Sequence, residues 1–164
     1  MSKSKKITTT YELYSDRKDL PKQHRKLLKA AKKALKHSYS PYSKFRVSAA
    51  LLLANGEVVT GTNQENAAYT MCLCAERVAI AAADAMYNGV PVTMIAITVK
   101  NALKEITEPG APCGACRQVM CETEYKHQQD MEVILQGESG DILVFPSGKS
   151  LLPLSFDGGF LGES

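Results

Sequence analysis

Two kinds of apolar pattern follow one another along the chain, and each predicts a different element. After residue 20, apolar residues recur at helical spacing while lysines occupy the opposite positions, which is the pattern of a surface helix. The apolar stripe consists of Leu27, Leu28, Ala31 and Leu35. We place the helix N-cap at Asp19, with Pro21 in the first turn, and the end of the helix at the serine-rich cluster 38–43.

A short apolar run predicts a strand over residues 46–54, and a second strand follows over 57–61. Asn55 and Gly56 lie between them, and this pair suits a two-residue hairpin turn in which both central residues have positive φ. The same reasoning predicts helices over 74–88 and 113–125, and strands over 93–99, 132–135 and 142–145. A hairpin followed by alternating strands and helices indicates an α/β fold with a mixed sheet covered by helices.

Length and composition restrict the class of protein. A chain of 164 residues suits one domain, and its 45% hydrophobic and 23% charged residues exclude a mainly disordered, collagen-like or coiled-coil protein. Residues 1–18 lack a clear period, and we interpret them as a tail or docking arm. We therefore expect a basic N-terminal extension over residues 1–20 and one domain over 21–164. No long apolar run and no secretory signal are visible, so we expect a cytoplasmic protein.

Charge is distributed unevenly along the chain. Residues 1–46 carry fourteen lysines and arginines against three acidic residues, a net charge of +11. Residues 47–164 carry six lysines and arginines against fourteen acidic residues, a net charge of −8. A basic segment of this kind is either a solvated helix face or an electrostatic footprint for nucleic acid. From the sequence alone we interpret it as a solvated face.

Three cysteines occupy positions where thiolates are stabilised. Cys113 and Cys116 form a C-x-x-C at a predicted helix start, and Cys74 begins the other long helix. Helix N-termini carry unpaired amides and a partial positive charge, which favour thiolates. Three thiolates can hold one Zn²⁺ and leave its fourth position open to water, which is the pattern of a catalytic zinc site.

Glu76 follows Cys74 by two residues, so its carboxylate lies in the first helical turn, near the metal without ligating it. There it would act as a proton shuttle. Zinc deaminases share this pattern of His or Cys, Glu two residues later, and then Pro-Cys-x-x-Cys, which here is 112–116. Two alternatives stay open: a redox pair, which gives Glu76 no task, and a closed structural zinc site, whose fourth ligand would be Cys72 or Cys121. Outside such a site we expect both cysteines to be buried like apolar side chains.

Four motifs extend the pattern in both directions: SPYSKFRV at 40–47, NQENAAY at 63–69, CAER at 74–77 and PCGACRQ at 112–118. Together they resemble the cytidine deaminase family, specifically its small homotetrameric class with three zinc-binding cysteines, over roughly residues 21–156. The resemblance implies a three-layer α/β/α sandwich around a mixed five-stranded sheet. It also implies hydrolytic deamination of free cytidine and 2′-deoxycytidine to uridine and 2′-deoxyuridine with release of ammonia, a step of pyrimidine salvage, with one Zn²⁺ per subunit.

The resemblance assigns roles to individual residues. The implied zinc ligands are Cys74, Cys113 and Cys116, and Glu76 is the implied catalytic residue. Asn63 and Glu65 match residues that bind the sugar hydroxyls, and Phe45 matches an aromatic near the base. The implied substrate-binding set is completed by Asn66, Tyr69, Ala75 and Phe156. Of these, Tyr69 and Phe156 resemble residues that reach a neighbouring subunit's site, with Phe160 as a rival for the latter.

Two arginines adjoin the cysteines in sequence. Three thiolates and Zn²⁺ sum to a charge of −1, which weakens the metal as a Lewis acid. We expect Arg77, Arg117 or both to donate hydrogen bonds to the cysteine sulfurs and offset that charge.

We therefore expect a free nucleoside as substrate, a homotetramer with shared active sites, and neither a membrane nor a nucleic acid as partner. One rival is the same chemistry on a modified nucleoside or a polynucleotide base. The carboxylate of Glu65 argues against a polynucleotide because it would repel a phosphate. The other rival is a non-enzymatic zinc module, which would have no need of Glu76.

Overall fold

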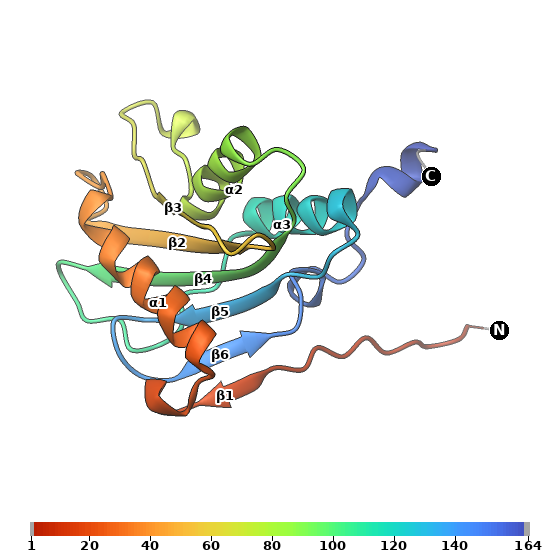
Figure 1. Cartoon of the computed structure of the whole chain (residues 1–164), viewed down its shortest axis with the longest axis horizontal. Helices are drawn as coiled ribbons and strands as arrows, with labels where there is room; N and C mark the ends of the chain where they lie inside the picture. The colour runs from red at the N-terminus through yellow and green to blue at the C-terminus, as the bar shows by residue number, and fades with distance from the viewer. Residues whose placement is uncertain (1, 163–164) are drawn as a thin grey trace.

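A six-stranded mixed sheet organises the computed structural model, which describes residues 2–162 (Figure 1). The strand order is β1-β6-β5-β4-β2-β3, and of the neighbouring pairs β4 and β5 alone run parallel in the described chain. The strands are β1 (Glu12–Tyr14), β2 (Phe45–Leu53), β3 (Val58–Thr62), β4 (Val92–Asn101), β5 (Glu132–Gln136) and β6 (Ile142–Phe145). The long helices are α1 (Lys22–Ala34), α2 (Ala75–Met86) and α3 (Gly114–His127). Within residues 2–162, no helix has the length and apolarity that crossing a bilayer requires.

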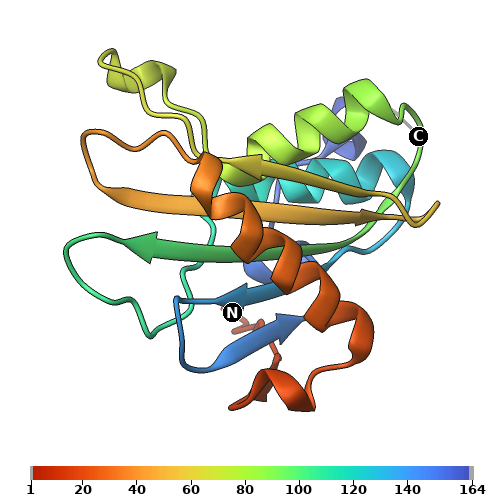
Figure 2. The ribbon, with the colours of Figure 1, turned by 60° about the vertical axis from the view of Figure 1, so that its left-hand side comes forward.

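Helix α1 covers one face of the sheet, and α2 and α3 cover the other (Figure 2). Strand β2 explains why both faces are covered. Ala49, Leu51 and Leu53 belong to the core on the α2 side, whereas Ala50 and Leu52 belong to the core on the α1 side. Successive side chains of a strand point to opposite faces, so a strand that is apolar at every position needs cover on both. The expected three-layer α/β/α sandwich is confirmed.

The sheet has six strands where five were expected. The additional strand is β1, which lies in the segment that we interpreted as a tail. Glu12, Leu13 and Tyr14 pair antiparallel with β6, and the ring of Tyr11 contacts that of Phe145 with centroids 5.2 Å apart. Three residues are too few to display the alternation by which a strand is recognised, so the sequence contained no signal for β1.

Two local expectations were wrong. Asp19 does not cap α1, because it ends a separate 3₁₀ turn and Pro21 occupies the N-cap position. The β2–β3 connection also differs from a two-residue turn: Gly56 has a positive φ of 89°, whereas Asn55 does not. The amide of Gly56 donates to the carbonyl of Leu53, and a longer loop with one left-handed glycine results.

Gly61 in β3 allows the first turns of α2 to approach the sheet. A Cβ atom at this position would lie 2.5 Å from the carbonyl oxygen of Ala75 and would also collide with the backbone nitrogen of Ala79. The obstacle is backbone, which cannot turn aside as a side chain can. The absence of a side chain at Gly61 therefore fixes where the N-terminus of α2 lies.

Candidate functional site

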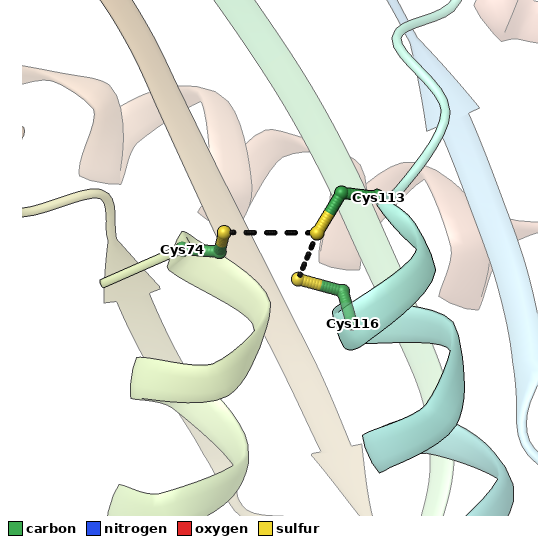
Figure 3. A group of neighbouring side chains, drawn as sticks. All are labelled: Cys74, Cys113 and Cys116. Carbon is green, nitrogen blue, oxygen red and sulfur yellow. Dashed lines mark hydrogen bonds between the residues drawn. The ribbon is translucent and has the colours of Figure 1, made fainter. Parts of the chain in front are cut away.

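The first turns of α2 and α3 bring three cysteines together on one face of the sheet (Figure 3). Cys74 is the N-cap residue of α2, Cys113 is the N-cap residue of α3, and Cys116 lies in the first turn of α3. The Sγ atoms of Cys74 and Cys113 are 3.9 Å apart, and those of Cys113 and Cys116 are 3.4 Å apart. Neither helix has a side-chain cap, so unpaired amides at both N-termini would stabilise the negative charge of thiolates that bind a metal here.

These distances fit one zinc ion. Tetrahedral Zn–S bonds of about 2.3 Å separate the sulfurs by about 3.8 Å, and the three Sγ atoms all lie within 4.8 Å of one another. Among the residues that the structure describes, no fourth cysteine, histidine or carboxylate belongs to this cluster. Cys72 and Cys121 are thus not part of it, which argues against the closed four-cysteine site and leaves one coordination position for water or substrate.

The thiols differ in their acidity. Burial raises the pKa of Cys74, and burial together with the charge of Glu76 raises the pKa of Cys116. Burial acts in the same direction on Cys113, but its hydrogen bonds with the Cys116 amide and with the thiols of Cys116 and Cys74 outweigh burial and lower the pKa of Cys113. A divalent cation has to displace the protons of the first two thiols to bind.

Glu76 is a buried carboxyl, 4% exposed, in the first turn of α2. Burial raises its pKa, against smaller opposing effects of its own amide, the Cys116 thiol and the charge of Arg77. A raised pKa brings a carboxyl closer to the pH at which it can both accept and release a proton, which suits it to proton transfer.

A cavity of about 520 Å³ opens beside the cysteines, a volume typical of small-molecule sites. The structure places most of the predicted site residues on its wall: Phe45, Asn63, Glu65, Cys74, Ala75, Glu76 and Cys113. Residues to which sequence reasoning assigned no role also line it, among them Ser43, Gln64, Ile97, Val99 and Gly110, and so does Cys72. The wall thus combines a metal-binding cluster, a buried acid and polar groups.

The loop at 40–44 holds the carboxylate of Glu65. The amides of Tyr42 and Ser43 donate to its Oε2 at 2.8 and 3.2 Å, and the hydroxyl of Ser43 donates to its Oε1. Burial opposes ionisation, but these hydrogen bonds and the charge of Lys44 lower the pKa of Glu65. Glu65 is therefore a fixed, charged acceptor on the cavity wall.

The side chain of Asn63 joins the end of β3 to the beginning of β2. Its Oδ1 accepts hydrogen bonds from the Ser38 hydroxyl at 2.5 Å and the Val47 amide at 2.8 Å, and its Nδ2 donates to the carbonyl of Phe45 at 2.9 Å. A carboxamide nitrogen carries two hydrogens, so one donor of Asn63 is available to a ligand in the cavity.

Three predicted substrate-binding residues lie outside the cavity wall. Asn66 is exposed, and its side chain accepts a hydrogen bond from the local backbone. Tyr69 is 72% exposed and contacts Tyr42 edge-to-face. Phe156 is 55% exposed and stacks on Phe160 with ring centroids 5.4 Å apart. None of the three is placed to touch a molecule held wholly inside this cavity.

The two arginines brace the backbone around the cysteines. Arg77 donates to the carbonyl of Cys72 at 3.3 Å, and Arg117 donates to the carbonyls of Pro112 and Leu151, both at 2.8 Å. The Nε of Arg77 is buried and has no hydrogen-bond partner among the described residues. That nitrogen is a buried donor that remains available.

Sequence reasoning missed the roles of Ser43 and Cys72. Ser43 stands inside a motif that was noticed, yet nothing in a sequence separates a serine that holds a carboxylate from an ordinary loop serine. Cys72 was expected to be buried, and it is instead half-buried on the cavity wall, where its Sγ accepts a hydrogen bond from the amide of Asn66 at 3.3 Å. Cys121 is buried, as expected.

Comparisons with known proteins agree with one another. Residues 21–129 match the family model described as the cytidine and deoxycytidylate deaminase zinc-binding region. The cytidine deaminase of Halalkalibacterium halodurans is 42% identical over 116 residues, which are 71% of this chain and 81% of that protein. The cytidine deaminase of Sporosarcina psychrophila is 41% identical over 133 residues, which are 80% and 89% of the two chains. The crystal structure of the Burkholderia pseudomallei cytidine deaminase has a TM-score of 0.70 at 43% identity and covers 81% of this chain and 98% of that one.

Proposed function

Because the chain belongs to the cytidine deaminase family, we propose that it catalyses the zinc-dependent hydrolysis of free cytidine and 2′-deoxycytidine to uridine and 2′-deoxyuridine, with release of ammonia. The observation that carries this proposal is the composition of one cavity wall. It combines a three-thiol metal centre, the buried acid Glu76 and the polar residues Asn63 and Glu65. Those are the parts that hydrolytic deamination of a small nucleoside needs, and the reaction belongs to pyrimidine salvage.

We assign the zinc ion to Cys74, Cys113 and Cys116. When bound, the metal supplies a hydroxide nucleophile near neutral pH by lowering the pKa of a coordinated water. The charge of −1 of this centre is offset by nearby donors. We propose that the buried Nε of Arg77 donates to one of the sulfurs, while Arg117 holds the backbone from which Cys113 and Cys116 project.

We assign the proton transfers to Glu76. Its carboxylate accepts a proton from the attacking water, delivers it to ring N3 of cytosine and then helps to protonate the amino group that leaves C4. One water is consumed, C4 becomes a carbonyl and ammonia departs. The burial of Glu76 shields these protons from exchange with bulk solvent.

The remaining cavity residues position the nucleoside. Glu65 is ionised and offers acceptors only, so it suits a sugar hydroxyl, and the available donor of Asn63 suits a second hydroxyl oxygen. Phe45 packs against the base, and Ala75 places the backbone between the metal ligand Cys74 and the acid. Fixing the sugar aligns C4 with its nucleophile, which is how binding energy contributes to the rate.

The oligomeric state is also a proposal. We propose a homotetramer in which Tyr69 and Phe156 of one subunit complete the site of another, with Phe160 as the alternative aromatic and Asn66 fixing the loop that carries Tyr69. The support is that these aromatics are exposed and lie outside the cavity of their own chain.

We also propose that residues 21–164 form the deaminase domain and that residues 1–20 form an extension. Residue 1 of the extension and residues 163 and 164 of the domain lie outside the described part of the chain. The family match begins at residue 21, which supports this division. We propose a cytoplasmic location, because all five cysteines are free thiols, as is usual in a reducing compartment.

The experiment is an ultraviolet assay of cytidine and 2′-deoxycytidine with zinc-loaded protein and its Glu76→Gln and Glu76→Ala variants. We expect turnover by the wild type and a loss of about 10²-fold or more in both variants, at unchanged zinc content. Deoxycytidylate, modified nucleosides and a cytosine-containing oligonucleotide serve as comparison substrates. Turnover of one of these compounds, but not of cytidine, would show that the proposed substrate is wrong. A zinc-loaded wild type that is inactive on all of them would overturn the proposed enzymatic function.

A further inference from the structure

Five lysines form a straight row along the solvent face of α1 and the 3₁₀ turn after it. They are spaced alternately four and three residues apart, which keeps them on one side of a helix with 3.6 residues per turn. All five are exposed: Lys22, Lys26, Lys29, Lys33 and Lys36. We call this row the lysine stripe. At a rise of about 1.5 Å per residue it is about 21 Å long.

Within the described chain, no ion pair neutralises a lysine of the stripe. No acidic residue occurs in the sequence between Asp19 and Glu57. Within the described chain, the lysines that form ion pairs are Lys100, Lys126 and Lys149, none of them in the stripe. Like charges three and four residues apart repel, and ordinary solvated surfaces intersperse both signs. An unpaired row therefore favours an anionic ligand over the solvated face that the sequence alone suggested.

A basic groove continues the stripe at its C-terminal end. Lys36 lines this groove of about 400 Å³ together with Lys32, Arg46 and Lys100. Its one acidic wall residue, Glu138, is already engaged by Lys100 at 3.7 Å. The cations thus continue from the helix onto the neighbouring strands, with Glu138 as the one acidic residue on the groove wall.

We propose that the lysine stripe and the basic groove bind the phosphate backbone of a nucleic acid. A duplex carries one negative charge for about every 1.7 Å of its axis when both strands are counted, so a row of cations about 21 Å long faces a comparably extended array of phosphates. No aromatic residue occurs in the sequence between Tyr14 and Tyr39, so bases have no stacking partner on this helix. Contact is therefore with the backbone and does not depend on base sequence.

The fold separates this surface from the catalytic cavity. Helix α1 packs on the opposite face of the sheet from α2 and α3, whose first turns carry the cysteines (Figure 2). A nucleic acid on α1 is thus a docking partner and not the substrate, and the carboxylate of Glu65 still disfavours a polynucleotide in the cavity.

A membrane surface fits α1 less well. Helices that bind membranes insert an apolar face among the lipids. The apolar face of α1, with Leu27, Leu28 and Ala31, is buried against the sheet. Only charge would then attract the protein to anionic lipid.

The test measures fluorescence anisotropy of a labelled 20-base-pair DNA duplex, titrated with the full chain at several salt concentrations. Phosphate contacts by the five lysines of the stripe predict a slope of log K against log salt of about −4.5, and contacts in the basic groove make the slope steeper. In the variant Lys26→Gln, Lys29→Gln and Lys33→Gln, we expect the slope to weaken by about 2.7 and affinity at low salt to fall at least tenfold. Exposed substitutions of this kind leave the fold intact, which a thermal melt checks.

The matched control is the triple variant Lys100→Gln, Lys126→Gln and Lys149→Gln, which removes the same charge from lysines already paired with acids. It should weaken the slope by no more than about 1, the contribution of Lys100 in the groove. Equal losses in both variants, or no duplex binding by the wild type, would overturn the proposal. So would binding to phosphatidylserine vesicles without duplex binding, or salt-dependent self-association that the first variant abolishes. Deamination is not a readout, so failure of the proposed activity would be seen separately.

Discussion

The hydroxyl of Ser43 donates a hydrogen bond to the carboxylate of Glu65, across 22 residues of sequence. The same hydroxyl oxygen accepts a hydrogen bond from the amide of Phe45 at 3.0 Å. Ser43 therefore links a wall residue of the cavity to the first residue of β2. The hydroxyl has one hydrogen, and because Phe45 orients the oxygen, that hydrogen is directed at Glu65.

We expect Ser43→Ala to raise KM for both nucleosides about 5- to 10-fold with little change in kcat, because one charge-assisted hydrogen bond to a binding group is lost. The pKa of Glu65 is lowered by its donors, so removing one donor raises that pKa. Glu65 then becomes protonated at a higher pH as the solution is acidified. The acidic limb of kcat/KM should therefore move to higher pH, which steady-state kinetics over a pH series measures.

Ser40→Ala is the control, because Ser40 lies in the same loop and its side chain makes none of the hydrogen bonds to Glu65. An unchanged acidic limb in Ser43→Ala, with KM also unchanged, would show that the two backbone amides alone hold Glu65.

Gly61→Ala should disturb the metal centre indirectly, because Gly61 lies in β3 and packs against the first turns of α2. The new methyl group would collide with the backbone of Ala75 and Ala79, so the helix that presents Cys74 and Glu76 has to move. We expect a cost of about 1–3 kcal/mol, and a chain of this length loses about 2–4 °C of Tm per kcal/mol. Zinc content and turnover should fall together, as measured by metal analysis and the ultraviolet assay.

Gly114→Ala provides the contrast. A Cβ there meets nothing within 4 Å, although Gly114 adjoins the ligand Cys113. Because alanine favours a helix over glycine by up to about 1 kcal/mol, Tm should hold or rise slightly. Equal effects of the two substitutions would mean that contact of β3 with α2 does not position the site.

The parts of the site that sequence could predict are those set by local rules. Cys74, Cys113 and Cys116 were placed at helix N-termini because helix starts and C-x-x-C spacing are local features. Strand β2 was predictable because an unbroken apolar run needs cover on both faces. The side of α1 that packs into the core was predictable because its apolar residues recur at helical spacing.

What escaped prediction depends on partners distant in sequence. Strand β1 forms because it pairs with the edge strand β6, and a segment of three residues is too short for its sequence to predict that pairing. Asn55 and Gly56 suit more than one turn, and the register of β2 against β3 selects the longer loop. Nothing near Arg117 in the sequence indicates that its guanidinium donates to the carbonyl of Leu151, 34 residues away. Such contacts follow from the assembled fold and not from spacing.

Loading the metal-free protein with zinc should release protons. The pKa values of Cys74 and Cys116 are raised, so both thiols are protonated at neutral pH and zinc has to displace both protons. We expect at least two protons per zinc in a weakly buffered titration, and weaker binding as pH falls, because protons compete for the same sulfurs. Cys116→Ser should lower both the release and the affinity. Zinc uptake without proton release would contradict the assignment of these thiols as ligands.

Glu124 gives a prediction for stability that is independent of the metal. Its fully buried carboxylate accepts hydrogen bonds from the amides of Met131, Gly148 and Lys149, at 2.8, 2.7 and 3.1 Å, and so ties α3 to the start of β5 and to the turn after β6. Each buried donor left unsatisfied costs about 1–3 kcal/mol, so Glu124→Ala should cost at least about 3 kcal/mol. Glu122→Ala, on the exposed side of the same helix, should stay within about 0.5 kcal/mol of the wild type. Chemical denaturation of the two variants measures the difference. Equal stabilities would mean that water replaces the carboxylate at all three amides, which their burial opposes.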